Sequence, residues 1–298
     1  MVEKAIHLKD VQNVIVNWLD KYDVDEIFDH TFIFGSLINR DGRHFVPQGS
    51  MASDVDLVLR LGDHLEGANS RFEAILKLRS IVPELEHETA KVLGRKSVEP
   101  IYSILPITSY EIHQCIHKGH DPKLFMSNLF LDARTGERLE AGLTNYVDYD
   151  YHFENLEPFS VIRLSQSYRN RYLRCDHLGV YSQGDFDGDT AFPKEVMRSA
   201  ALLRFYDGKQ DDGARRTDLE EGNRYISRLI EDLADESDRH RQLWDTVSAR
   251  SFPRGDTPNL LADQMLLIHE IMYDKARSLV IPSVRDAIRE VMESEIGE

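Results

Sequence analysis

Apolar positions in the first third of the chain recur with two different spacings. Residues 8–22 carry apolar side chains three and four positions apart, which predicts a helix. Residues 31–35 form a short apolar and aromatic run that ends at a glycine, which predicts a strand entering a turn. Residues 54–61 alternate in the manner of a strand and predict a second one.

The pattern then returns to helical spacing. Residues 70–93 predict a helix with a break near Pro83, because proline removes a backbone donor from a helix interior. Residues 98–107 predict a third strand. A short helix should begin at Ser109, because serine is a residue type that caps helices.

Helical spacing dominates the second half, and the composition changes near residue 150. We therefore expect an α+β protein, with helices and strands in a first domain over residues 1–150 and a helical domain over residues 151–298. The helices predicted in the second half cover residues 158–175, 192–206, 218–235, 238–249, 259–275 and 278–295.

Charge and composition narrow the possible partners and the expected cellular location. The formal net charge of -16 gives no basic coat on average, so a long nucleic acid is the least favoured partner. No apolar run reaches the ~18 residues that a membrane span needs, and the N-terminus does not resemble a signal peptide. Cys115 and Cys175 are too few for a disulfide framework. These features predict a soluble protein in the cytoplasm, with no membrane partner.

Two carboxylates on the second strand are the first candidates for chemistry. Asp54 and Asp56 are two residues apart, so an extended backbone projects both side chains to the same side. Carboxylates this close repel each other, and a divalent cation between them relieves the repulsion. Magnesium suits such oxygen ligands and often takes a substrate phosphate as a further ligand, so the pair predicts a metal site.

A glycine and a serine follow the first strand and predict a phosphate contact. Gly35 would allow a phosphate to approach the backbone closely, and Ser36 would open a helix whose N-terminus and hydroxyl donate to phosphate oxygens. Ser53, just before the first aspartate, would cap the turn or contact the same phosphates. Each motif alone is typical of a turn or a solvated strand, and only their joint occurrence favours a site.

Together, Phe32–Ser36 and Ser53–Val58 resemble the DNA polymerase beta-like nucleotidyltransferase superfamily, which includes minimal, antibiotic and cGAS-like (CD-NTase) nucleotidyltransferases. The resemblance implies a mixed sheet flanked by helices in the first domain, followed by an appended helical domain. It also implies Mg²⁺, or Mn²⁺ in its place, held by Asp54 and Asp56. The implied reaction moves a nucleoside monophosphate from an NTP such as ATP to an acceptor hydroxyl and releases pyrophosphate.

The sequence departs from the superfamily pattern in two places. The spacer between Ser36 and Asp54 holds 17 residues, which is long, and its Arg40, Arg43 and His44 would contact phosphates or face water. The third carboxylate that the superfamily commonly carries is expected on the next strand near residue 103.

Serine occupies that position. Glu99 lies four residues before Ser103, about 13 Å along an extended strand, and Glu111 lies beyond the strand. Neither is a direct substitute, so the identity of the general base stays open.

Basic residues of the second half are candidates for binding a triphosphate. Lys194 and Arg198 lie four apart at the start of a predicted helix and face the same way, either toward phosphates or toward surface glutamates. The segment from Arg163 to Arg174 carries arginines interleaved with tyrosines, and it predicts either a solvated helix face or a phosphate-binding face.

A zinc site is a weaker hypothesis. His113 and His117 are four apart on the helix predicted after the third strand, with Cys115 between them. A polar helix face is the favoured interpretation of this spacing, because the sequence offers little to complete a zinc site beyond Cys175 and His177.

Three functions are therefore open. The favoured one is a magnesium-dependent nucleotidyltransferase whose acceptor is a nucleotide, an RNA end, a protein or a small molecule. The second is a catalytically weak or inactive nucleotide-binding or regulatory module of the same fold, in a defence or toxin–antitoxin system. The third is a protein-interaction partner that docks another chain through its helical half.

Overall fold

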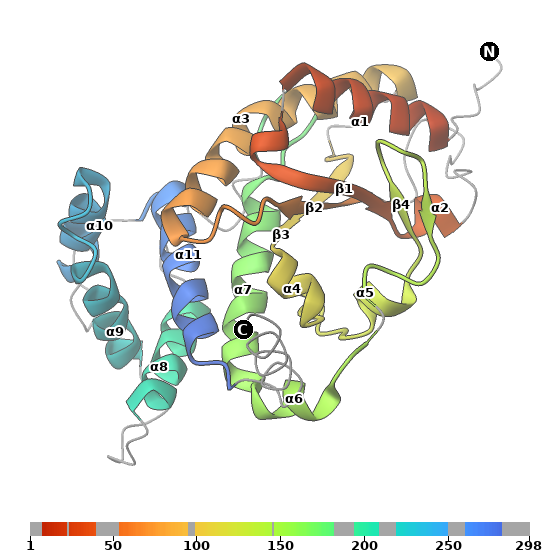
Figure 1. The fold of residues 1–298 in the computed structure, drawn as a ribbon. Coiled ribbons are helices and arrows are strands. Elements are labelled where there is room, and N and C mark those ends of the chain that lie inside the picture. The colour runs from red at the N-terminus through yellow and green to blue at the C-terminus, as the bar shows by residue number, and fades with distance from the viewer. Residues whose placement is uncertain are drawn as a thin grey trace, which may run out of the picture.

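A mixed sheet lies at the centre of the first half of the chain (Figure 1). The computed structural model describes residues 8–22, 24–39, 54–94, 99–144, 146–181, 194–208, 219–249 and 260–281. Within these, five strands run in the order β3-β2-β1-β4-β5; β2 and β3 are parallel and the other pairs antiparallel. The strands are β1 (Phe28–Phe34), β2 (Val55–Leu61), β3 (Tyr102–Ile107), β4 (Phe130–Asp132) and β5 (Arg138–Leu139).

The two faces of the sheet bury different hydrophobic clusters, because side chains on β2 alternate between the faces. Val55 and Leu57 lie in the larger cluster, which includes α1 (Leu8–Tyr22) and α3 (Ala68–Leu93). Val58 lies in a smaller cluster with Phe130. Figure 1 shows α1 and α3 on one side of the sheet, and α4 (Ser109–His113) and α5 (Leu124–Ser127) on the other. The alternation places Asp56 on the face of Val58.

The helices after residue 148 confirm the predicted change from a mixture of helices and strands to mainly helical structure in the second half. Their bounds agree with the predicted ranges to within a few residues, except that α11 ends at Ser278 and the helix expected over 278–295 falls almost wholly outside the described residues. The sequence did not indicate α6, β4 or β5. In the described part of this half, the helices are α6 (Tyr149–Glu154), α7 (Leu156–Tyr172), α8 (Lys194–Gly208), α9 (Leu219–Glu231), α10 (Asp238–Ser248) and α11 (Ala262–Ser278).

Helix α3 continues through Pro83, so the predicted break is wrong. Proline cannot bond to the carbonyl four residues earlier, which here is that of Arg79. The hydroxyl of Tyr181 donates to this carbonyl instead, and the indole of Trp18 donates to the carbonyl of Ile81 at 3.0 Å. These tertiary bonds and the packing of α1 stabilise the helix across the proline.

Helix α4 begins at Ser109 as predicted, but Thr108 is its cap. The Thr108 hydroxyl accepts from the Glu111 amide, and the Glu111 carboxylate accepts from the Thr108 amide at 2.6 Å. The helix ends at His113, and Cys115 adopts a left-handed backbone with φ of 53°. His113 and His117 therefore do not share a helix, contrary to prediction.

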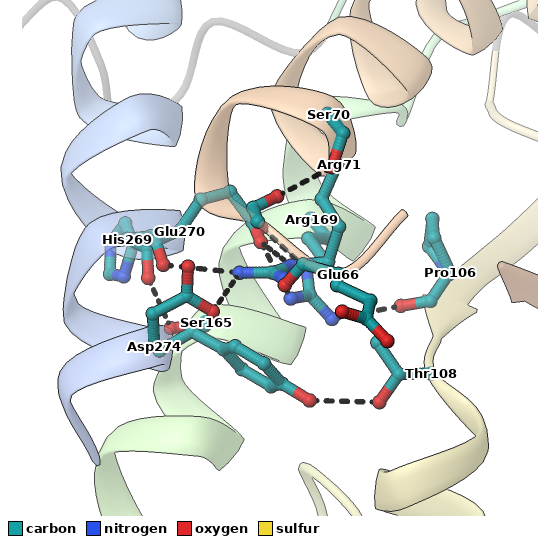
Figure 2. Close-up of polar contacts among 12 residues, drawn as sticks. Glu66, Ser70, Arg71, Pro106, Thr108, Ser165, Arg169, His269, Glu270 and Asp274 are labelled. Atoms are coloured by element: carbon teal, nitrogen blue, oxygen red, sulfur yellow. Dashed lines mark hydrogen bonds and ion pairs between the residues drawn. The ribbon is translucent and has the colours of Figure 1, made fainter. Parts of the chain in front are cut away.

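A buried ionic network joins the helical half to the first half (Figure 2). Arg71 of α3 and Arg169 of α7 both bond to Glu270 of α11, and each of these three side chains is fully buried. Arg169 also contacts both carboxylate oxygens of Glu111, at 3.2 and 3.1 Å. The carboxylates keep the pKa of Arg169 raised against the opposing effect of burial. The network fixes α7 and α11 against α3 and α4.

None of the helices in the described part of the chain is both long and apolar enough to cross a membrane.

Candidate active site

Gly35 and Asp56 meet at the end of the β1–β2 pair. Phe34 and Asp56 are partners in the antiparallel register, and Gly35 follows Phe34 with φ of +80°. A Cβ atom placed on Gly35 would lie 2.5 Å from Oδ2 of Asp56. The structure therefore brings Gly35 and Asp56 together, and the left-handed backbone and the close approach favour a glycine at position 35.

The two aspartates differ in exposure. Asp54 is exposed and directly precedes β2, whereas Asp56 is half-buried within it. Burial and, secondarily, the Asp54 charge raise the pKa of Asp56 to about 6, against the lowering effects of Lys118 and of a hydrogen bond from Ser103. A buried carboxylate next to a second one is unfavourable unless a cation is bound.

Ser36 opens α2 (Ser36–Asn39), as the sequence predicts. The contact of this helix start with phosphate stays a prediction. The Ser36 hydroxyl stays a candidate phosphate contact beside Gly35. Ser53 and the loop cations Arg40, Arg43 and His44 lie outside the described residues.

Ser103 lies next to Asp56 on the neighbouring strand. The two residues are direct partners in the parallel β2–β3 register, and the Ser103 side chain is hydrogen-bonded to Asp56. The strand position that pairs with Asp56, where the resemblance implies a third carboxylate, thus holds a hydroxyl. Glu111 cannot replace it, because it is fully buried and bound to Arg169 and to the Thr108 amide.

Lys118 and Asn170 complete the surroundings of Ser103. The Lys118 ammonium donates to Oδ1 of Asn170. Nδ2 of Asn170 donates to the Ile104 carbonyl at 2.6 Å and to Oγ of Ser103 at 3.4 Å. The sequence interpretation missed both residues, because Lys118 lies in a loop after α4 and Asn170 lies on α7, far from the aspartates along the chain.

Four charged side chains affect the pKa of Lys118. Burial is the main cause that lowers its pKa; Asp56 and Asp54 oppose this effect, while Arg174 and Arg171 reinforce it. Lys118 is half-buried, Arg171 is half-buried and Arg174 is exposed. Three cations therefore accompany the two carboxylates.

The arginine-rich segment is divided between two environments. Arg163 and Arg169 are buried, so the interpretation of the whole segment as one solvated or phosphate-binding face is wrong for them. Arg171 and Arg174 lie close enough to Lys118 for their charges to lower its pKa.

Comparison with known proteins agrees with this geometry. A protein-family model described as "Pol beta superfamily nucleotidyltransferase in conflict systems" matches residues 14–278. The chain belongs to this family. No curated protein and no solved structure matches the chain.

Members of the Pol beta nucleotidyltransferase superfamily generally use divalent metals. In this family member, Asp54 and Asp56 fit such an ion, because Asp56 is a half-buried carboxylate whose pKa is raised by burial and by its neighbour. Among the described residues, no group of three or more His, Cys, Asp or Glu side chains could hold a metal. Within the described residues, the aspartates thus offer two carboxylates to a cation.

The second-half cations Lys194 and Arg198 lie on a different part of this family member. Their helix, α8, packs against α9 and α7, and Figure 1 shows α7 between α8 and α2. Arg198 is exposed, and the Lys194 side chain lies outside the described residues. The structure does not bring α8 to the cluster around Asp56.

The zinc hypothesis finds no support in the described residues. His117 is buried with its ring edge against Phe125, and burial lowers its pKa to about 4. Cys115 donates to the Tyr146 carbonyl, and Cys175 is a second buried free thiol. His117 is therefore a core residue, and the alternative of a polar helix face is also wrong for it.

Proposed function

We propose that the chain transfers a nucleoside monophosphate from an NTP to an acceptor hydroxyl and releases pyrophosphate, in a reaction that requires Mg²⁺ or Mn²⁺. The family match supports transfer in general. The close approach of Asp56 to Gly35 is the single observation that supports this site, because it joins the metal-binding candidates to the phosphate-binding turn.

Asp54 and Asp56 would hold the metal in this proposal. A bound divalent cation would neutralise charge on the reacting phosphate and lower the barrier to attack. Asp56 would have to be ionised, which its raised pKa of about 6 allows at neutral pH.

The triphosphate would lie between the aspartates and the basic cluster. Gly35 would let a phosphate oxygen approach the backbone, and the hydroxyls of Ser36 and Ser53 would donate to phosphate oxygens. Arg171 and Arg174 would face the outer phosphates, since both lie close enough to Lys118 to affect its pKa.

The chemical step is an in-line displacement at the α-phosphorus. The bond from the acceptor oxygen to this phosphorus forms while the bond to the bridging oxygen breaks. Pyrophosphate leaves with the bonding electron pair, and the acceptor proton passes to water. The protein contributes position and electrostatic stabilisation, because the strand position that pairs with Asp56 holds a serine and not a carboxylate.

The acceptor is a nucleotide, an RNA end, a protein or a small molecule. The net charge of -16 makes a long nucleic acid the least favoured of these. A role in a biological conflict system agrees with the family description. The protein would act in the cytoplasm, and a protein partner would use the helical half.

A nucleotide-binding module without turnover is the second candidate. The serine at position 103 favours it, because this position in the β2–β3 register is where the superfamily commonly has a carboxylate.

Incubation with each labelled NTP and with Mg²⁺, followed by mass spectrometry of all products, tests the proposal. We expect pyrophosphate release that is abolished by Asp54→Ala/Asp56→Ala and retained in Asp245→Ala, which removes an exposed carboxylate on α10. Metal-dependent NTP binding without turnover would support the second candidate. Absence of NTP binding would refute both.

A further inference from the structure

A continuous row of hydrogen bonds leads from Asp56 to a cation. Ser103 is bonded to the Asp56 carboxylate, and its Oγ accepts from Nδ2 of Asn170 at 3.4 Å. The other side of the Asn170 amide, Oδ1, accepts from the Lys118 ammonium. The amide orientation is fixed, because Nδ2 also donates to the Ile104 carbonyl at 2.6 Å. The ammonium is thus tethered one amide away from Ser103.

The ligands that the described residues offer bear on how many divalent ions the site holds. Each magnesium or manganese ion needs several oxygen ligands, and two ions are held together when carboxylates supply both. The described residues offer Asp54 and Asp56 but no third metal-ligating side chain with them. The neighbouring strand position contributes a hydroxyl that is already shared between Asp56 and Asn170.

We propose that this site binds a single divalent cation, on Asp54 and Asp56, and that the Lys118 ammonium supplies the positive charge that a second ion would otherwise bring. This inference rests on the proposed function. Lys118 would face the phosphates, whereas Ser103 and Asn170 are positioning residues that hold the carboxylate and the ammonium in place. The interactions of Lys118 with both Asp56 and Asp54 agree with this arrangement.

The direction of the hydrogen bonds supports these assignments. Asn170 donates to Ser103, and this leaves the Ser103 hydroxyl proton for Asp56. A carboxylate at position 103 would instead add a third anionic ligand beside Asp56. The wild-type residue therefore disfavours a second divalent ion, and a one-residue change should create its site.

Counting bound Mn²⁺ by electron paramagnetic resonance tests this directly. The probe is Mn²⁺ titrated into the full chain with an α,β-methylene NTP analogue, so no turnover is needed. We expect one tightly bound Mn²⁺ per wild-type chain and two in Ser103→Asp. Ser103→Asn, which adds bulk without charge, should stay at one.

Removing the ammonium gives a second measurement that does not depend on Ser103→Asp folding. Lys118→Met should keep one Mn²⁺ and bind it on the order of 3- to 10-fold more tightly, because a neighbouring positive charge is lost. Lys123→Met, which removes an exposed lysine near the ring of Tyr149, should leave the affinity unchanged.

The outcomes separate this inference from the proposed function. Two tight Mn²⁺ ions per wild-type chain would overturn the single-cation site while leaving nucleotidyl transfer intact. An unchanged Mn²⁺ affinity in Lys118→Met would overturn the role of the ammonium. Absence of both Mn²⁺ and analogue binding in the wild type would overturn the proposed function as well.

Discussion

At the scale of single residues, two small residues, Gly35 and Ser103, shape the surroundings of Asp56. Gly35 leaves room for the Asp56 carboxylate, and Ser103 places a hydroxyl and not a carboxylate at the strand position that pairs with Asp56. The joint occurrence of the two motifs, and their resemblance to a known superfamily, predicted that Gly35 and Asp56 meet. Lys118 and Asn170 were not predictable, because only tertiary packing of α7 brings them to β3.

Replacing Gly35 by alanine should lower both the stability of the protein and its transfer rate. The new Cβ would meet Oδ2 of Asp56 at 2.5 Å, and the left-handed backbone adds strain. We expect a loss of about 1–2 kcal/mol in unfolding free energy. The transfer rate should fall on the order of 100-fold, because displacement of a catalytic group by about 1 Å costs that much. Urea unfolding and pyrophosphate release measure the two effects.

Gly94 supplies the matched control for that substitution. It also has a left-handed backbone, with φ of +60°, but a Cβ there would meet nothing within 4 Å. Gly94→Ala should lose about 1 kcal/mol from strain and keep the wild-type rate. Equal rates in the two alanine variants would contradict the role given to Gly35.

The raised pKa of Asp56 predicts a cost in stability for the metal-free protein. Its folded value of about 6 exceeds the ordinary 3.8, so the folded state holds this proton more tightly than the unfolded state. The ionised form is therefore penalised above pH 6, and the penalty fades as the pH falls toward 4. With chelator present, Asp56→Asn should be more stable than wild type by about 1–2 kcal/mol at pH 8, after allowance for solvent screening.

Urea unfolding at two pH values checks this sign. The advantage of Asp56→Asn should shrink to less than half at pH 4.5. Asp245→Asn, at an exposed site, should show no pH-dependent advantage. An Asp56→Asn advantage that grows at low pH would refute the assigned direction.

At the scale of elements, hydrophobic periodicity predicted the long helices and the first three strands. The short strands β4 and β5 carry too few residues for a pattern, and α3 crosses Pro83 because Tyr181 satisfies the Arg79 carbonyl. Local residue types placed the start of α4 correctly but selected Ser109 as the cap, one residue late.

The cap of α4 can be tested by two neighbouring alanine substitutions. Thr108→Ala should lower the unfolding free energy by about 1–2 kcal/mol, because it removes the cap and the bond between Thr108 and the buried Tyr273 hydroxyl. Ser109→Ala removes only an exposed bond to Asp63 and should cost less than about 0.5 kcal/mol. Thermal unfolding measures both, and a larger loss in Ser109→Ala would restore the serine as the cap.

At the scale of the whole molecule, composition and periodicity predicted an α+β chain with a change of character near residue 150. They could not predict how closely the two halves pack. One hydrophobic cluster contains Ile15 of α1, Leu57 of β2 and Leu266 of α11. Buried charges cross the same interface, where Arg71 and Arg169 share Glu270. We therefore expect the proposed domains to unfold as one cooperative unit.

The two tryptophans of the chain report on the two halves separately. Trp18 is buried on α1, and Trp244 lies on α10, which contacts α3 through Arg239 and Phe72. In Trp18→Phe and Trp244→Phe, the fluorescence of the remaining tryptophan and the far-ultraviolet circular dichroism should share one urea midpoint within each variant.

Breaking the buried ionic network around Arg169 should lower the urea midpoints of both tryptophan signals together. Arg169→Met leaves Glu270 and Glu111 without a shared cation, so we expect a loss of about 3–5 kcal/mol. Arg241→Met, which removes an exposed ion pair with Asp235, should cost at most about 1 kcal/mol. If Arg169→Met lowered the midpoint of the Trp244 signal and left that of Trp18 in place, the halves would be independent folding units. A common shift would mean that the buried network couples the helical half to the sheet that carries Asp56.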